Sequence, residues 1–217
     1  MSQVKELKLK CSKCGEEFDI DIYETVNITT DPELKKRVLT KDIFKVNCPK
    51  CGELHRINYP VIYADEEKKI LVSLVTKQSK LDDLKDLDNI KKINYLSEYC
   101  CRLVVDMHEF IEKVLVLDAG LNDKAIEVMK VIVLSSGDFD RKNLRNCYFG
   151  GVYEDKLRFD VVMRDGTIRV ANVGMDSYEK CYEANRKEFD ENPQEWRFVN
   201  FDWALDFMAK QLKIDKK

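Results

Sequence analysis

Two short cysteine motifs constrain the fold of this chain more than any other feature of its sequence. The stretch CSKCG begins at Cys11, and the stretch CPKCG begins at Cys48. Two residues between cysteines form a tight turn that directs both thiolates at one centre, and the glycine that follows can adopt a positive φ. Backbone amides in such a turn donate hydrogen bonds to the sulfurs. Four thiolates in a tetrahedron suit zinc, so we expect one structural zinc ion bound by Cys11, Cys14, Cys48 and Cys51.

Other interpretations of these cysteines fit the sequence less well. A single C-x-x-C pair is typical of a thioredoxin-like redox site, but no strand–helix–strand context surrounds either pair. A catalytic zinc ion would need an open coordination position, which four thiolates do not leave. His55 follows Cys51 by four residues and could replace one thiol, although four cysteines complete the site without it.

The residues around each cysteine pair alternate between apolar and polar side chains, which is the pattern of a β-strand. The expected strands span residues 7–10, 18–22, 44–46 and 54–57. Each pair therefore lies at the tip of a hairpin, as in a zinc ribbon. The segment between the hairpins is long for a ribbon, and we expect it to contain a helix that runs to Val38, with Asp31 as N-cap and Pro32 as the first helical residue.

Residues 11–63 resemble the CpXC-domain proteins of bacteria and archaea. The matching sequence is VNITTDPELKKRVLTKDIFKVNCPKCGELHRINYPVIYADEEKK, in which CPKC corresponds to the name-giving motif. The resemblance extends into the stretch FIEKVLVLDAGLNDKAIEVMKVIVL. Ser12 stands where the motif has proline, and because proline only stiffens the turn, this departure does not threaten metal binding. The resemblance implies a metal-binding N-terminal module that uses the four cysteines, and it implies no particular activity.

Length and composition indicate a globular chain with more than one region. The chain has 217 residues, of which 44% are hydrophobic and 35% are charged. The charged run at 77–93 predicts a linker or a short helix. It would separate a zinc-ribbon-like module at 1–76 from an α+β region at 94–217.

Two helices are expected at the start of the second region. Apolar residues at three- and four-residue steps predict a long helix over 94–118, which ends near Gly120. Asn122 can cap a second helix that runs to about residue 134, and the short connection predicts an antiparallel helical hairpin. The second helix is apolar on most sides, so we expect it to be buried. Another copy of the chain could cover it, which predicts a homodimer.

The C-terminal part combines a β-hairpin with two further helices. The expected strands span 157–163 and 167–173. Asp165-Gly166 between them is typical of a type I′ turn. A polar helix is expected over 178–191, and a last helix begins at Asn200 or Asp202. The predicted fold class is therefore α+β: a zinc-ribbon-like β module, then a helical hairpin and a C-terminal β-hairpin and helix region.

The sequence shows no recognisable catalytic constellation. His108 and Glu109 lack the second histidine of a zinc protease. Asp106, Glu109 and Glu112 share one face of the expected long helix. Such a row could hold a cation, but it is more typical of a solvated face on which Lys113 pairs with Glu109. We expect the remaining cysteines to pack as small residues at or near the core. They are Cys100, Cys101, Cys147 and Cys181.

We expect a cytoplasmic protein with a binding or scaffolding role toward an unknown protein partner, rather than an enzyme. The stretch MSQVKELKLK lacks the apolar segment of a secretion signal, and no apolar run is long enough to cross a bilayer. The net charge of −3 argues against strong nucleic-acid binding. Two alternatives stay open: a nucleic-acid-associated regulator that uses the ribbon or the basic tail at 210–217, and an enzyme with a site in the C-terminal α+β region.

Overall fold

The structure is a computed structural model in which part of the chain is described. The described residues are 1–75, 98–136, 139–140, 142–191 and 196–214. In this part of the chain, no helix has both the length and the apolar character that a membrane span requires. The expected linker at 77–93 lies outside the described residues, so the domain boundaries drawn from it stay a prediction.

The described residues form two compact units. Unit 1 consists of the described residues up to Ile111, together with Trp196. Unit 2 consists of the other described residues, from Glu112 onward. The division falls inside one helix, α3, which spans Met107–Asp118.

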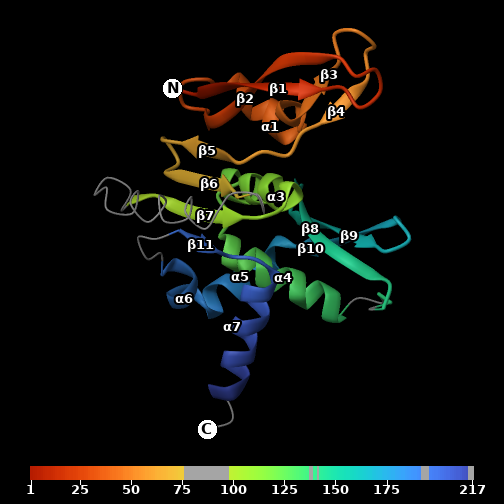
Figure 1. The fold of residues 1–217 in the computed structure, drawn as a ribbon. Coiled ribbons are helices and arrows are strands. Elements are labelled where there is room, and N and C mark those ends of the chain that lie inside the picture. Colours follow the sequence, from red (N-terminus) through yellow and green to blue (C-terminus); the bar gives the residue numbers. More distant parts are fainter. Residues whose placement is uncertain (76–97, 137–138, 141, 192–195, 215–217) are drawn as a thin grey trace. The chain divides into compact units, whose positions relative to one another are not determined.

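Two antiparallel hairpins carry the cysteine motifs in unit 1, as the alternating pattern predicts. The first hairpin consists of β1 (Gln3–Lys10) and β2 (Glu17–Asn27). The second consists of β3 (Lys45–Asn47) and β4 (Leu54–Arg56). Figure 1 shows both hairpins in the N-terminal part of unit 1. The predicted zinc-ribbon layout is therefore present in the backbone.

The segment between the hairpins contains the expected helix, but its N-terminus differs from the prediction. Helix α1 spans Glu33–Leu39, and the short 3-10 helix η1 spans Asp42–Phe44. Pro32 occupies the N-cap position, and no side chain caps the helix. The carboxylate of Asp31 instead accepts hydrogen bonds from the backbone amide of Ser2 and the hydroxyl of Thr30, at 2.9 and 2.8 Å. The Asp31 side chain therefore binds the N-terminal segment through Ser2 and does not cap α1.

The sheet of unit 1 continues from the first hairpin into three buried strands. These are β5 (Val61–Asp65), β6 (Ile70–Leu74) and β7 (Cys100–Val104), and the strand order is β1-β2-β5-β6-β7. β5 pairs with β2 and β7 pairs with β6 in parallel, whereas β5 and β6 are antiparallel. Buried aromatic side chains fill this core, and the ring of Phe44 contacts those of Tyr59 and Phe110.

The prediction of one helix over 94–118 is wrong over Cys100–Val104, where the chain forms β7 instead, and its first residues, 94–97, lie outside the described part of the chain. The residues of β7 after Cys100 are buried, including Arg102. A strand covered on both faces carries a continuous apolar run, which helical spacing fits as well as strand spacing does. The helix begins only at Met107, where the carboxylate of Asp106 accepts hydrogen bonds from the amides of His108 and Glu109 at 2.7 and 3.3 Å.

The predicted helical hairpin is confirmed. Gly120 follows α3 with φ 70°, and the amides of Gly120 and Leu121 donate to the carbonyls of Leu117 and Val116, both at 3.1 Å. This pair of bonds is a Schellman C-cap. The side chain of Asn122 accepts hydrogen bonds from the amides of Lys124 and Ala125 in the first turn of α4, at 3.1 and 3.2 Å. Helix α4 spans Asp123–Ser136.

A three-stranded antiparallel sheet follows in unit 2. Its strands are β8 (Leu144–Tyr153), β9 (Lys156–Met163) and β10 (Ile168–Gly174), in the order β10-β9-β8. The hairpin β9–β10 was predicted correctly, but the prediction that a type I′ turn connects its strands is wrong. Gly166 has φ 88°, Asp165 is not among the residues with positive φ, and the Gly166 amide donates to the carbonyl of Met163 at 3.1 Å. The four-residue connection therefore begins with a type I turn.

The last helices complete unit 2. The polar helix expected over 178–191 is two helices, α5 (Met175–Ala184) and α6 (Arg186–Asp190), which meet at Asn185. The short strand β11 spans Arg197–Phe198, and α7 spans Phe201–Ile214. The side chain of Asn200 accepts from the Trp203 amide at 3.0 Å and caps α7, as predicted.

The core of unit 2 surrounds α4. This helix packs against α5, α7 and β8, and its apolar side chains join those of β9 in one buried cluster. The α4 face that suggested a homodimer is thus covered by the chain itself, and the oligomeric state stays a prediction. With helices and strands in both units, the α+β fold class is confirmed.

Candidate metal centre

The two cysteine motifs form loops with the same backbone structure. In the first loop, the amide of Cys11 donates to the carbonyl of Glu16 at 2.8 Å, and the amide of Gly15 donates to the carbonyl of Cys11 at 3.0 Å. The equivalent bonds in the second loop measure 2.9 and 2.9 Å. Gly15 and Gly52 have φ 75° and 73°, a left-handed conformation that glycine adopts without strain. The predicted turn is therefore confirmed in both loops.

The four sulfurs of these loops lie together. The Sγ atoms of Cys11 and Cys51 are 3.7 Å apart, those of Cys14 and Cys48 are 3.6 Å apart, and all four lie within 4.8 Å of one another. A zinc–sulfur bond of about 2.3 Å gives a tetrahedron with edges of about 3.8 Å, whereas a disulfide bond measures about 2.05 Å. The spacing fits four separate ligands of one ion. The cluster could hold a metal ion.

Burial differs among the four cysteines. Cys11 and Cys48, the first residue of each loop, are each 2% exposed. Cys14 and Cys51 are more exposed. A metal ion in this cluster would therefore lie at the surface of unit 1, with one side covered by the hairpins.

His55 contacts the sulfur cluster without being part of it. The side chain lies on β4, and its Nε2 atom is 3.3 Å from the Sγ atom of Cys11. With its proton on Nε2, the imidazole donates a hydrogen bond to the sulfur. Such contacts stabilise thiolate ligands from outside the coordination sphere. His55 therefore supports Cys11 rather than replacing a thiol.

The loop backbone and the neighbouring thiols shift the cysteine pKa values in opposite directions. The backbone amide of Cys14, followed by that of Lys13 and the His55 side chain, outweighs burial and lowers the pKa of Cys11 to about 6. The amide of Glu16 lowers the pKa of Cys14, but burial and the other three thiols outweigh it and raise that pKa to about 12. Burial and the neighbouring thiols therefore favour the protonated form of Cys14, whereas the loop amides favour the thiolate form of Cys11.

Two ion pairs around the cluster were not predicted from the sequence. Lys13 lies 3.0 Å from Glu53, and Lys50 lies 2.8 Å from Glu16. The signal that could have found them is the longer repeat Cys-x-Lys-Cys-Gly-Glu, which occurs at 11–16 and again at 48–53. The sequence interpretation used only the cysteines and glycines of this repeat.

The acidic row on α3 does not form one solvated face. Asp106 is exposed and caps the helix, and Glu109 is half-buried. Glu112 is 3% exposed and Lys113 is 2% exposed, so the expected surface positions of these two residues are wrong. Helical periodicity alone cannot show that α4 supplies charged partners for them.

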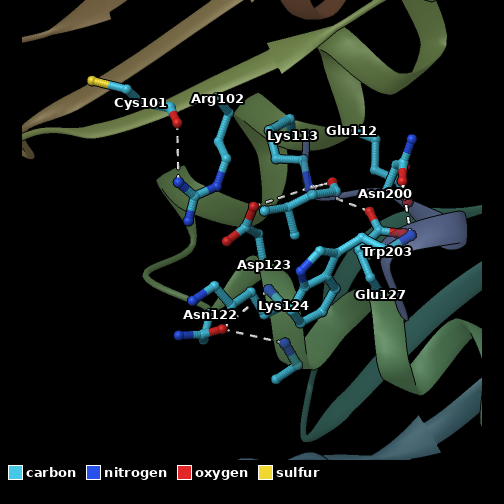
Figure 2. Close-up of polar contacts among 12 residues, drawn as sticks. Cys101, Arg102, Glu112, Lys113, Asn122, Asp123, Lys124, Glu127, Asn200 and Trp203 are labelled. Atoms are coloured by element: carbon cyan, nitrogen blue, oxygen red, sulfur yellow. Dashed lines mark hydrogen bonds and ion pairs between the residues drawn. The ribbon is translucent and has the colours of Figure 1, made fainter. Parts of the chain in front are cut away.

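Glu112 and Lys113 belong to a buried charge network of unit 2. Lys113 Nζ lies 3.1 Å from Asp123, 3.2 Å from Glu127 and 2.7 Å from the carbonyl of Val199. Figure 2 shows Lys113 between the carboxylates of Asp123 and Glu127. A second lysine, Lys130 on α4, lies 3.1 Å from Glu112 and 2.7 Å from Glu127.

Burial and pairing determine the ionisation of this network. Burial raises the pKa of Glu112 to about 7, although Lys130 and the Phe149 amide act against it. Burial alone would lower the pKa of Lys130, but Glu112 and Glu127 outweigh it and raise that pKa above its usual value. The same competition raises the pKa of Lys113, through Asp123 and Glu127. Both lysines are therefore cations.

The remaining cysteines are not part of the cluster. Cys101 and Cys147 are buried, and Cys100 and Cys181 are half-buried. Burial raises the pKa of Cys101 to about 11 and that of Cys147 to about 12. These two thiols are protonated at neutral pH and pack as small core residues, as expected.

Comparison with known proteins agrees with the cysteine cluster. The chain is 23% identical over 152 residues to an uncharacterised protein of Treponema pallidum (strain Nichols), an alignment that covers 66% of this chain and 69% of the relative. No solved structure matches the chain. The family model described as CpXC protein matches residues 9–130, which include both cysteine loops. The chain therefore belongs to the CpXC family.

Proposed function

We propose that the four-cysteine cluster binds one structural zinc ion, with Cys11, Cys14, Cys48 and Cys51 as its ligands. The observation that carries the proposal is the arrangement of the four sulfurs, whose pairs at 3.6 and 3.7 Å have the spacing of a tetrahedral tetrathiolate site. Thiolate ligands favour zinc over the hard cations calcium and magnesium, which bind oxygen.

The role of this site is to build a binding surface and not to catalyse a reaction. Four protein ligands fill the coordination sphere of zinc and leave no position for water or substrate. The hairpin β3–β4 has only three residues in each strand, which is too short to be stable alone. The ion ties this hairpin to β1–β2, so the module can present a fixed surface to a protein partner.

The cytoplasm is the compartment that suits this chemistry. Thiolate ligands require a reducing environment, since an oxidising one would convert neighbouring cysteines to disulfides. The chain carries four further cysteines, none of which forms a disulfide in the structure. We therefore place the protein where thiols stay reduced.

Elemental mass spectrometry of untagged, freshly reduced protein tests the proposal. We expect one zinc ion per chain, lost in Cys48→Ser together with thermal stability. Cys181→Ser is the matched control, because that half-buried thiol lies outside the cluster, and this variant should keep its zinc. Wild-type protein that binds no zinc would overturn the proposal and make a redox dithiol the better interpretation of the two pairs.

A further inference from the structure

The two cysteine loops contact each other in an approximately twofold-symmetric way, in which each group of one loop contacts the opposite kind of group in the other loop. Each loop has the sequence Cys-x-Lys-Cys-Gly-Glu, and the loops differ only at Ser12 and Pro49. The close sulfur pairs join the first cysteine of one loop to the second cysteine of the other. An interface in which equivalent groups exchange partners in this way is self-complementary, as in a symmetric dimer.

The charged residues of the loops follow the same exchange. The lysine of the first loop, Lys13, pairs with Glu53 of the second loop at 3.0 Å. The lysine of the second loop, Lys50, pairs with Glu16 of the first loop at 2.8 Å. Neither lysine pairs with the glutamate of its own loop. The two ion pairs therefore act as cross-loop bridges.

The position of these bridges suggests a role that concerns the cluster more than the fold. The lysine side chains are both 62% exposed, and exposed ion pairs contribute little to the stability of a fold. Each bridge does, however, join the two loops beside their ligands. It links a lysine that lies between the two cysteines of one loop to the glutamate that follows the glycine of the other loop.

We propose that Lys13–Glu53 and Lys50–Glu16 are positioning residues of the metal centre, which hold the two cysteine loops at the separation that the ion requires. Each bridge links the loops directly, so the sulfurs of one loop stay opposite those of the other. The lysines also offset the charge of about −2 that a divalent ion with four thiolates carries. This inference rests on the proposed zinc site and adds four residues to it.

A charge-swap experiment on the full chain tests the bridges. Zinc affinity is measured by competition with a chromophoric chelator for the wild type, Lys13→Glu, Glu53→Lys and the double variant with both changes. Each single change places like charges opposite each other, and we expect zinc affinity to fall roughly tenfold, as for other groups outside a coordination sphere. The double variant restores the pair with its charges exchanged and should recover most of the affinity.

Two controls make the result specific. Lys10→Glu changes the net charge equally, but its partner Glu17 lies 3.2 Å away within the same hairpin, so zinc affinity should stay close to that of the wild type. The pair Glu16→Lys and Lys50→Glu repeats the cycle on the other bridge, and circular dichroism verifies that each variant is folded. The proposed role of the bridges would be wrong if the double variant bound zinc as weakly as the single variants, or if the single variants bound it as tightly as the wild type. Neither result would contradict the zinc site itself. Wild-type protein without zinc would overturn both.

Discussion

At the scale of single residues, position along a helix does not determine whether a charge is solvated. Glu109 and Glu112 are one helical turn apart on α3, yet only Glu112 is buried. The difference comes from α4, whose Lys130 lies 3.1 Å from the Glu112 carboxylate. The amide of Phe149 on β8 donates to the same carboxylate at 2.5 Å. Because Glu112 is buried among these groups, its ionisation should make the free energy of unfolding depend on pH.

Glu112 should make the protein less stable as the pH rises. Burial raises its pKa from 4.5 to about 7 in the folded state, so between these values the folded state binds more protons than the unfolded state. This contribution to stability is complete below about pH 4.5 and is lost by about pH 7, which amounts to roughly 3 kcal/mol at most. Glu112→Gln is neutral at every pH. Relative to the wild type, this variant should become more stable from pH 5 to pH 8 in urea unfolding.

The exposed Glu179 on α5 provides the control for this titration. Glu179→Gln should follow the wild-type curve over the same pH range, because its side chain is exposed. Several other groups face Glu112, namely Lys113 and Glu127 in addition to Lys130, and all of them are present in both proteins being compared. Parallel curves for Glu112→Gln and the wild type would show that Glu112 is ionised throughout.

The loop glycines should be needed for their backbone conformation and not for space. Gly15 has φ 75°, and a Cβ atom built on it meets no atom within 4 Å. Gly15→Ala therefore costs only the strain of a left-handed residue, about 1 kcal/mol, and zinc affinity should fall roughly fivefold. Asparagine adopts this conformation more readily than alanine does, so Gly15→Asn should lose less affinity. Equal losses in the two variants would show that the turn does not depend on φ.

At the scale of helices and strands, local patterns predicted the elements whose signals are local. The alternating residues beside each cysteine pair, the Gly120 cap and the Asn122 cap all identify elements that the structure contains. Strand β7 was missed because its apolar run also fits helical spacing, and the pairing that makes it a strand is with β6, which lies far away in the sequence. The parallel pairings and the ion pairs across the cysteine loops depend on such non-local contacts as well. The four cysteines that the structure brings together, in contrast, could be identified from their spacing alone.

Lys113 should be essential to the packing of the helical hairpin. Its ammonium group pairs with Asp123 and Glu127 and donates to the Val199 carbonyl at 2.7 Å, and its side chain is 3% exposed. Lys113→Met leaves two buried carboxylates without this cation. Breaking a buried pair from one side costs about 3–5 kcal/mol, which urea unfolding would measure. Lys180→Met is the control, because its ion pair with Asp176 on α5 is exposed. Equal stability of the two variants would show that the buried network relaxes without Lys113.

At the scale of the whole molecule, each of the two units is stabilised internally by a different kind of interaction. Unit 1 carries the sulfur cluster, whose cysteines come from the tips of two hairpins, and the strands of the second hairpin, β3 and β4, contain no buried residue. Unit 2 has a large apolar cluster built from α4, β8 and β9 together with the later helices. Metal removal should therefore affect the two units unequally.

Hydrogen exchange with and without a zinc chelator should reveal this difference. In zinc-loaded protein, we expect protection of the amides in β1–β2 and β3–β4, whose tips carry the four cysteines. Chelation should abolish protection in β3–β4 and reduce it near the tip of β1–β2, because the ion supplies folding free energy to short hairpins. The amides of β9, which pair on both sides and whose inward side chains lie in the unit 2 core, should exchange at unchanged rates.

Cys48→Ser without chelator should reproduce the same pattern, which separates loss of the ion from any effect of the chelator. Equal loss of protection in β9 would mean that unit 2 depends on the metal centre and that the chain unfolds as one cooperative body. Unchanged protection in β3–β4 would mean that the hairpin is stable through its own contacts. The expected pattern, local opening around the cysteine loops with an intact α4 core, is the one in which zinc acts on the module that contains it.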